Sequence, residues 1–339
     1  MLSTLALGFR HVDGMDRDRI ATRNLPGRAT AKIKFRLCQD FQQIALSEGY
    51  GILIVAADVF APIRVVERYG GPWDGPPSLE LVVFFWQKTK LEEHLQKIRE
   101  RGNKTHNFDS DRLALEWTIL AKFEDALRPI ACTIRTRLFT SSRVRCPMPR
   151  TLNWDRSFSI HLIVQVRGLG LVTVDGDEHA YASNRIGICA IYDPPAMDVV
   201  LCTQPLHHLQ SMEKVWPGHF WIWAVHHLAP LGPRGHMVLY DLDGSAADLV
   251  KPFVRDGTME YVDNFQDRLG FPSSLRDCPG CVEILAYDHC LAISRGIADW
   301  VGVVHAPDTF LANTAGPAPG GVMDLLRPQL ASTAVVLLP

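Results

Sequence analysis

The sequence predicts an α+β fold, with a mixed α/β N-terminal half followed by a β-rich C-terminal half of sandwich or jelly-roll type. Strand-like and helix-like patterns alternate before residue 150, whereas short apolar runs separated by Gly or Pro recur after it. Between the two, at 145–157, prolines coincide with a shift in charge. We therefore expect an extended N-terminal arm at 1–30, a basic α/β domain at 31–150 and a β-rich domain at 151–339.

The first half begins with the arm and three predicted strands. Residues 10–30 are polar, charged and interrupted by Gly and Pro, which is typical of extended chain. The segment 31–41 alternates like a strand, and 51–60 is a continuous apolar run that fits a buried strand. A third strand is predicted at 79–87, after a cluster of Gly and Pro.

Two helices are predicted to follow. In 90–102, leucines and an isoleucine recur at helical spacing, and a glycine stands at the end. In 109–129, Asp109 or Ser110 can cap the helix and Pro129 can stop it.

The second half has the pattern of short strands. The segment 158–182 predicts a hairpin that turns at Asp175 and Gly176, because this dipeptide supplies the positive φ angles of a type I′ turn. Six more apolar runs fit strands, at 186–192, 197–202, 219–228, 236–240, 282–287 and 300–304. The apolar C-terminal tail, 330–339, is too short to span a membrane, so we expect it to dock on a partner.

The charges of the two halves are opposed. Residues 1–150 contain 24 Lys and Arg against 17 Asp and Glu, while 151–339 contain 11 against 20. Such asymmetry favours either a polyanion partner or head-to-tail packing of like subunits. Arginine suits phosphate and carboxylate groups, and we expect six arginines in an acid-poor stretch to bind nucleic acid or an acidic partner: Arg128, Arg135, Arg137, Arg143, Arg145 and Arg150.

Eight cysteines are spread along the chain, and no secretion signal is evident at the N-terminus. We therefore expect reduced, buried thiols in an intracellular (cytoplasmic) protein, with a virion as the other expected location. A structural zinc site is the alternative, with Cys278, Cys281, His289 and Cys290 as weak candidate ligands. Because His289 and Cys290 are adjacent, a strand would direct them to opposite faces, and three ligands are easier to assemble than four.

The segment 236–253 contains the sequence DLDGS at 241–245. It resembles the first motif of the haloacid-dehalogenase superfamily of phosphohydrolases, in which a strand ends in Asp-x-Asp-Gly-Thr/Ser. The resemblance implies that Asp241 is a nucleophile and magnesium ligand and that Asp243 is the general acid/base. The chain after Asp241 is short for that family, and Lys251 is its only lysine. A strand-ending turn with Gly244 at positive φ explains the same residues.

The sequence therefore favours a non-enzymatic assembly subunit over an enzyme. We expect it to pack against copies of itself or a larger shell protein, for example in a viral capsid as a capsid or clamp-like protein. Hydrophobic residues make up 47% of the chain, which is high for an isolated monomer. The alternatives are the magnesium-dependent phosphohydrolase and a protein that binds RNA or DNA. We expect no membrane partner and, in the leading hypothesis, no cofactor or catalytic residue.

Overall fold

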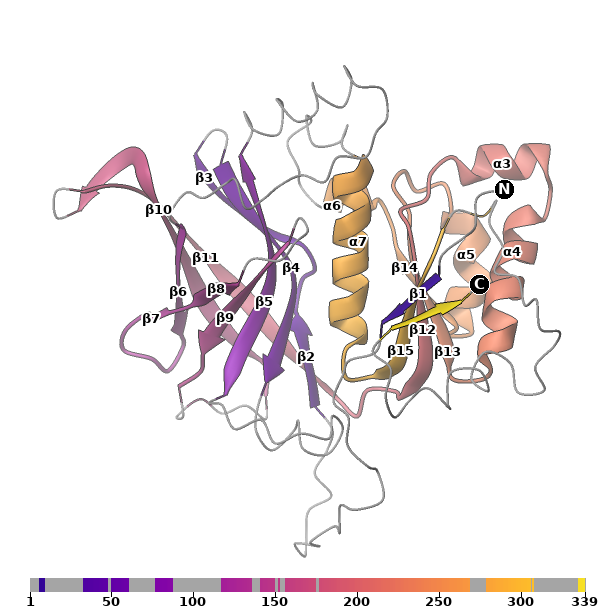
Figure 1. Cartoon of the computed structure of the whole chain (residues 1–339), viewed down its shortest axis with the longest axis horizontal. Coiled ribbons are helices and arrows are strands. Elements are labelled where there is room, and N and C mark those ends of the chain that lie inside the picture. Colours follow the sequence, from indigo (N-terminus) through magenta and orange to yellow (C-terminus); the bar gives the residue numbers. More distant parts are fainter. Residues whose placement is uncertain are drawn as a thin grey trace, which may run out of the picture.

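The computed structural model describes residues 6–9, 33–47, 50–60, 77–87, 117–135, 141–149, 152, 156–174, 177–268, 279–305, 307 and 335–338. Its described part is mostly β, in antiparallel and parallel sheets, with fewer helices, which agrees with the predicted α+β class only in its coarse form. Figure 1 shows two units on either side of the long helix α7 (Pro279–Ser294). One is an antiparallel β sandwich, and the other is an α/β unit.

The sandwich is built from two five-stranded antiparallel sheets. Sheet B has the order β2 (Ile33–Leu37), β11 (Asp177–Tyr192), β10 (Phe158–Val174), β6 (Trp117–Phe123) and β7 (Ile130–Ala131). Sheet C has the order β3 (Gln42–Ser47), β4 (Tyr50–Phe60), β5 (Ser78–Gln87), β9 (Ser142–Pro147) and β8 (Thr133–Arg135). Strands β10 and β11 form the predicted hairpin, with Val174 paired to Asp177.

Two corners at which the chain passes from one sheet to the other carry disulfides. Between β2 and β3 it does so at residues 38–41, and between β7 and β8 it does so at Cys132. Each corner carries a disulfide, Cys38–Cys189 in the first and Cys132–Cys146 in the second. Closing a chain loop in this way stabilises the fold, mainly by restricting the unfolded state.

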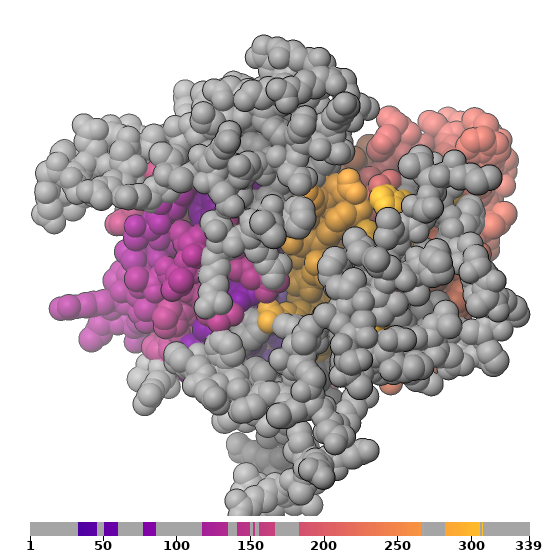
Figure 2. Space-filling view, in the orientation of Figure 1, coloured from indigo at the N-terminus to yellow at the C-terminus, as the bar shows by residue number. Residues whose placement is uncertain are grey.

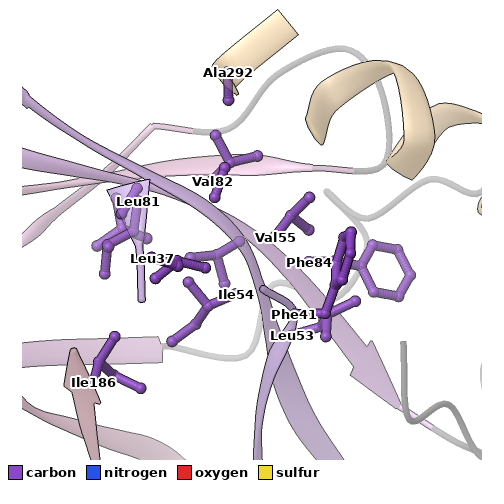
Figure 3. Packing of buried hydrophobic residues seen from close by; sticks show 14 of the residues in the cluster. Leu37, Phe41, Leu53, Ile54, Val55, Leu81, Val82, Phe84, Ile186 and Ala292 are labelled. Atoms are coloured by element: carbon purple, nitrogen blue, oxygen red, sulfur yellow. The ribbon is translucent and has the colours of Figure 1, made fainter. Parts of the chain in front are cut away.

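The apolar core is shared by both sheets and by α7. Residues 51–57 of β4 are all buried, because sheet B covers one face of sheet C and α7 covers the other. Figure 3 shows part of this core, with Ile54 and Val55 of β4, Leu81 and Val82 of β5, and Ala292 of α7. Burial on two faces explains why residues 51–57 of β4 are apolar without interruption.

The α/β unit is built on a six-stranded sheet A with the order β14 (Met259–Val262), β13 (Gly235–Tyr240), β12 (Met197–Thr203), β15 (Ala298–Val304), β1 (Ala6–Phe9) and β16 (Val335–Leu338). The first four strands are parallel; β1 pairs antiparallel with β15, and β16 pairs antiparallel with β1 and so runs in the same direction as the first four. Strands β1 and β16, which are far apart in the sequence, therefore lie side by side in one sheet (Figure 1).

Helices cover both faces of sheet A. One face packs on α3 (Leu209–Val215), α4 (His219–Leu228) and α5 (Ala247–Arg255), with Phe220, Trp223 and Phe253 in the core between. The other face packs on α7, and Cys290 of α7 is disulfide-bonded to Cys202 of β12. The short elements η2 (Ala229–Leu231) and α6 (Phe265–Arg268) complete the described helices.

Several sequence predictions are wrong. The helix expected at 109–129 is strand β6 over Trp117–Phe123, where Ile119, Ala121 and Phe123 are buried and alternate with less buried residues. The runs 219–228 and 282–287, expected as strands, belong to α4 and α7. Periodicity alone does not separate a short buried strand from part of a buried helix. The helix expected at 90–102 lies outside the described residues.

The order of the halves also differs from the expectation. All helices of the described ranges lie after residue 208, and the sandwich is formed by strands from both sides of residue 150. Strand β10 pairs with β6 across the expected boundary. The arm expected at 1–30 contributes β1, and the tail expected to dock on a partner pairs with β1 instead. The rest of the arm is not among the described residues.

The expectation of reduced thiols is wrong for six of the eight cysteines, which form the three disulfides. Such bonds form in oxidising surroundings, virion surfaces among them. Within the described ranges, no helix is both long and apolar enough to cross a lipid bilayer.

Candidate functional site

The strand order of sheet A contains a topological switch point. The chain passes from β12 outwards to β13 and β14, and then returns through α7 to β15 on the other side of β12. The order β14-β13-β12-β15 is thus that of the first mononucleotide-binding half of a doubly wound fold plus one strand. In open α/β sheets, ligands bind beyond the carboxyl ends of the strands at such a point. We call this side of sheet A, where β12 to β15 end, the carboxyl edge.

DLDGS lies at the carboxyl edge, directly after β13. Asp241 is fully buried. Its carboxylate accepts hydrogen bonds from the Ala246 N–H at 2.7 Å, the Tyr261 hydroxyl at 2.8 Å and the Asp243 N–H at 3.3 Å. Burial raises the pKa of Asp241, although the hydrogen bonds from Ala246 and Tyr261 oppose the rise. The side chain of Asp241 therefore fixes the loop that follows it and connects this loop to Tyr261 of β14.

Asp243 and Ser245 hold the start of the neighbouring helix. The Asp243 carboxylate accepts the His208 N–H at 3.0 Å and the Ser245 N–H at 3.1 Å. The Ser245 hydroxyl accepts the Leu209 N–H at 3.0 Å. These two side chains thus bind N–H groups at the start of α3, which the side chain of His208, at its N-cap position, does not do.

The two carboxyl groups differ in their readiness to lose a proton. Burial acts to raise the pKa of Asp243, but hydrogen bonds from Ser245 and the His208 main chain outweigh it and lower the pKa to about 2. Asp243 is therefore ionised at neutral pH, and a general acid needs a pKa near the working pH. Together with the occupied carboxylate of Asp241, this argues against the roles that the haloacid-dehalogenase resemblance implies.

The turn itself has the predicted backbone geometry. Gly244 has a φ of +74°, and a β-carbon there would lie 3.2 Å from the Asn264 side-chain oxygen. Helix α5 follows this turn and continues through Pro252 to Arg255.

Polar side chains also follow the two strands at the switch point. Gln204 comes after β12 and His305 after β15, and the His305 Nδ1 lies 3.1 Å from the Gln204 Oε1. Nearby, the His219 Nε2 at the start of α4 lies 2.8 Å from the Pro307 carbonyl oxygen. The space beyond the carboxyl ends of β12 and β15 is thus bordered by an amide group, imidazole groups and a main-chain carbonyl group.

The expected arginine-rich binding face is used partly inside the protein. Arg143 and Arg145 of β9, together with Arg295 after α7, form ion pairs with the buried Glu80 of β5. Burial acts to raise the pKa of Glu80, but the arginines, Arg143 foremost, outweigh it and lower the pKa. Arg128 is exposed in the turn after β6. The Arg135 side chain, Arg137 and Arg150 are not described.

The weak zinc set is not assembled as expected. Cys290 is disulfide-bonded to Cys202, so its sulfur is not a thiolate ligand. His289 is buried, and its Nδ1 lies 2.7 Å from the Tyr240 hydroxyl. Cys278 and the side chain of Cys281 are not described. In the described part of the chain, no three His, Cys, Asp or Glu residues are grouped as metal ligands would be.

Sequence reasoning missed Gln204, Tyr261 and His305. A signal for two of them is present, because Gln204 and His305 follow apolar runs that were predicted as strands. Their meeting depends on those strands being parallel neighbours. The sequence pattern was interpreted as antiparallel, which would have placed consecutive strand ends at opposite edges.

No protein-family model matches the chain, and no curated protein has a similar sequence. The site is therefore interpreted from its geometry.

Proposed function

We propose that the protein binds a nucleotide at the carboxyl edge of sheet A, with the nucleoside part held between the ends of β12, β13 and β15. The observation that carries the proposal is the strand order β14-β13-β12-β15 with its switch point at β12 and β15. A βαβαβ unit of this kind is the mononucleotide-binding half of doubly wound folds.

Asp243 supports the nucleoside as the ligand. It follows the second strand of the unit, and its side chain is 36% exposed, whereas Asp241 is fully buried. With its pKa at about 2, Asp243 is a permanently charged hydrogen-bond acceptor. Acidic residues in doubly wound folds bind ribose hydroxyls in this way. Each Asp243 oxygen accepts one main-chain N–H, and Oδ2 also lies 3.4 Å from the His208 Nδ1, so a ligand hydroxyl would share this carboxylate with these groups.

The helix at the switch point indicates which part of the ligand is recognised. Helix N-termini commonly bind phosphate, but at α4 the Glu213 carboxylate already accepts the Gly218 and Phe220 N–H groups, each at 2.6 Å. We therefore assign the base and ribose, rather than a phosphate group on α4, to the contacts at Gln204, Asp243 and His305.

The test is titration of the full chain with ADP, GDP, CDP and UDP in magnesium buffer, by calorimetry. We expect one of them to bind, and Asp243→Asn to raise its Kd about tenfold, because the ligand hydroxyl then donates to a neutral amide oxygen instead of a carboxylate. Asp256→Asn is the matched control, since Asp256 also accepts an N–H in a turn, that of Thr258, but before β14 at the opposite edge. Equal affinity of wild type and Asp243→Asn, or no binding of any of the four, would overturn the proposal.

A second candidate, the assembly subunit, is favoured by an exposed apolar surface on α3 and α4. Its members are Val215, Trp216, Trp221, Ile222 and Val225, which are between 38% and 66% exposed. This surface lies at the end of the molecule farthest from the sandwich, where the salmon region reaches the surface in Figure 2. Exposed apolar side chains gathered on two adjacent helices are typical of interaction sites. The opposed charges of the halves favour a second copy, packed head to tail, as the partner.

The second candidate is tested by sedimentation at several concentrations. The wild type is expected to associate, whereas the double variant Trp216→Ser, Ile222→Ser remains monomeric. Leu127→Ser is the control, because Leu127 is 97% exposed on an isolated turn. A wild type that is monomeric at all concentrations would refute this candidate.

A further inference from the structure

Four aromatic rings link the sandwich to the loop at the carboxyl edge. They belong to Phe41 in the corner between β2 and β3, His289 in α7, Phe265 in α6 and Tyr240 in β13. None of the nucleotide contacts proposed above involves these rings.

Phe41 is the sandwich residue of this group. It is 6% exposed and has a φ of 58°, a conformation that non-glycine residues rarely adopt. Such backbone strain persists only where the surrounding structure fixes it. Here the fixing elements are the disulfide Cys38–Cys189 on one side and aromatic contacts on the other. The Phe41 ring centre lies 5.2 Å from that of Phe265 and 4.6 Å from that of His289.

Phe265 and Tyr240 connect this contact to Asp241. The Phe265 N–H donates to the Asp241 carbonyl oxygen at 2.7 Å, and its ring meets that of Tyr240 edge-on at 4.8 Å. Tyr240 immediately precedes Asp241, and its hydroxyl lies 2.7 Å from the Nδ1 of His289. A displacement of Phe41 would therefore remove one ring contact from Phe265 and one from His289, and both of these rings contact Tyr240 directly before the loop 241–245.

We infer that the corner residue Phe41 is a positioning residue, through which the sandwich fixes the loop 241–245 and so sets nucleotide affinity at the carboxyl edge. This inference rests on the proposed nucleotide site. Because packed aromatic clusters have discrete arrangements, two ordered units can be coupled through such a contact. The sandwich then has a role in binding although it contributes no group to the ligand.

The experiment compares Phe41→Ala with Phe35→Ala. Phe35 is an equally buried sandwich residue whose ring contacts Phe158, away from the carboxyl edge. Amide hydrogen exchange of residues 241–247 is measured in both variants without ligand, and the Kd for the nucleotide that binds wild type is measured alongside. We expect Phe41→Ala to speed exchange in this loop and raise the Kd about tenfold, while Phe35→Ala leaves both at the wild-type value.

The outcomes separate the two proposals. Wild type that binds no nucleotide refutes the proposed function, and the exchange measurement still decides whether Phe41 fixes the loop. Unchanged exchange and Kd in Phe41→Ala overturn the inference while leaving the nucleotide site intact. If Phe41→Ala does not fold, Phe41→Leu is used, which keeps apolar volume but removes the ring; unchanged exchange in that variant overturns the inference equally.

Discussion

Replacement of Glu80 by Gln should destabilise the fold strongly. The Glu80 side chain is 5% exposed and forms ion pairs with Arg143, Arg145 and Arg295, whose side chains are 22%, 23% and 16% exposed. Gln keeps the volume but leaves three partly buried guanidinium groups without a carboxylate. Breaking a buried ion pair by changing one partner costs about 3 kcal/mol or more. We therefore expect the free energy of unfolding of Glu80→Gln at pH 7 to fall by about 3 kcal/mol.

The control is Glu124→Gln. Glu124 is also bound to an arginine and a serine, Arg185 and Ser159, but its side chain is 44% exposed and that of Arg185 is 66% exposed. Exposed pairs of this kind contribute at most about 1 kcal/mol. Urea unfolding followed by tryptophan fluorescence measures both variants, with wild type as reference. A loss in Glu80→Gln no larger than that in Glu124→Gln would refute the reasoning.

The same group predicts a pH dependence. The pKa of Glu80 is lowered in the folded protein from its ordinary value of 4.5. A carboxyl group with a depressed folded pKa stabilises the fold above its unfolded pKa, and this contribution is lost as the pH falls through the folded pKa. The stability difference between wild type and Glu80→Gln should thus be constant above about pH 5.5 and shrink below pH 4.5. A difference that is unchanged at pH 3.5 would contradict the assignment.

Two further predictions concern the α/β unit. The disulfide Cys202–Cys290 joins residues separated by 88 positions in the sequence, so its replacement by two alanines should lower the free energy of unfolding by about 4.5 kcal/mol in chemical denaturation. The free thiols of the unreduced wild type are titrated in denaturant. More than two free thiols would contradict the three disulfides. Asp241→Ala removes the side chain that accepts two N–H groups and the Tyr261 hydroxyl. In the same assay it should lower the free energy of unfolding by about 3 kcal/mol, whereas Tyr261→Phe should lower it by about 1 kcal/mol. Equal losses would show that the main-chain contacts of Asp241 contribute nothing.

The longer apolar strands were predictable, whereas β6 was predicted as a helix and the arrangement of the strands was not foreseen. The runs at 51–60 and 79–87 were identified as strands because almost every residue in them is apolar. The structure explains this composition, because most of their side chains are buried on both faces of the sheet. The segment 219–228 has the same apolar character and is a helix, since Phe220, Trp223 and Ala224 at helical spacing enter one core while Trp221 and Ile222 remain exposed. Periodicity did not reveal this, because an exposed apolar face hides the helical pattern.

The parallel sheet was missed for a related reason. The segments that form α4 and α7 were interpreted as strands, so consecutive apolar runs were predicted to be antiparallel neighbours, and the switch point did not emerge. Pairing between β1 and β16 joins residues that are more than 300 positions apart in the sequence. No local pattern encodes such contacts, and the same holds for the six paired cysteines, whose partners are set by the fold.

The charged residues show why a motif alone was misleading. Two aspartates with a glycine and a serine suggest metal and phosphate chemistry, and acid-poor arginines suggest a polyanion. In the fold, the Asp241 carboxylate accepts N–H groups of its own loop. Arg143 and Arg145 form ion pairs with Glu80, which precedes them by 63 and 65 positions in the sequence. A charged side chain can bind a ligand only to the extent that groups within the protein do not already occupy it. By that measure Asp243, ionised and partly exposed beside the ends of β12 and β13, is the residue of the motif on which the proposed function depends.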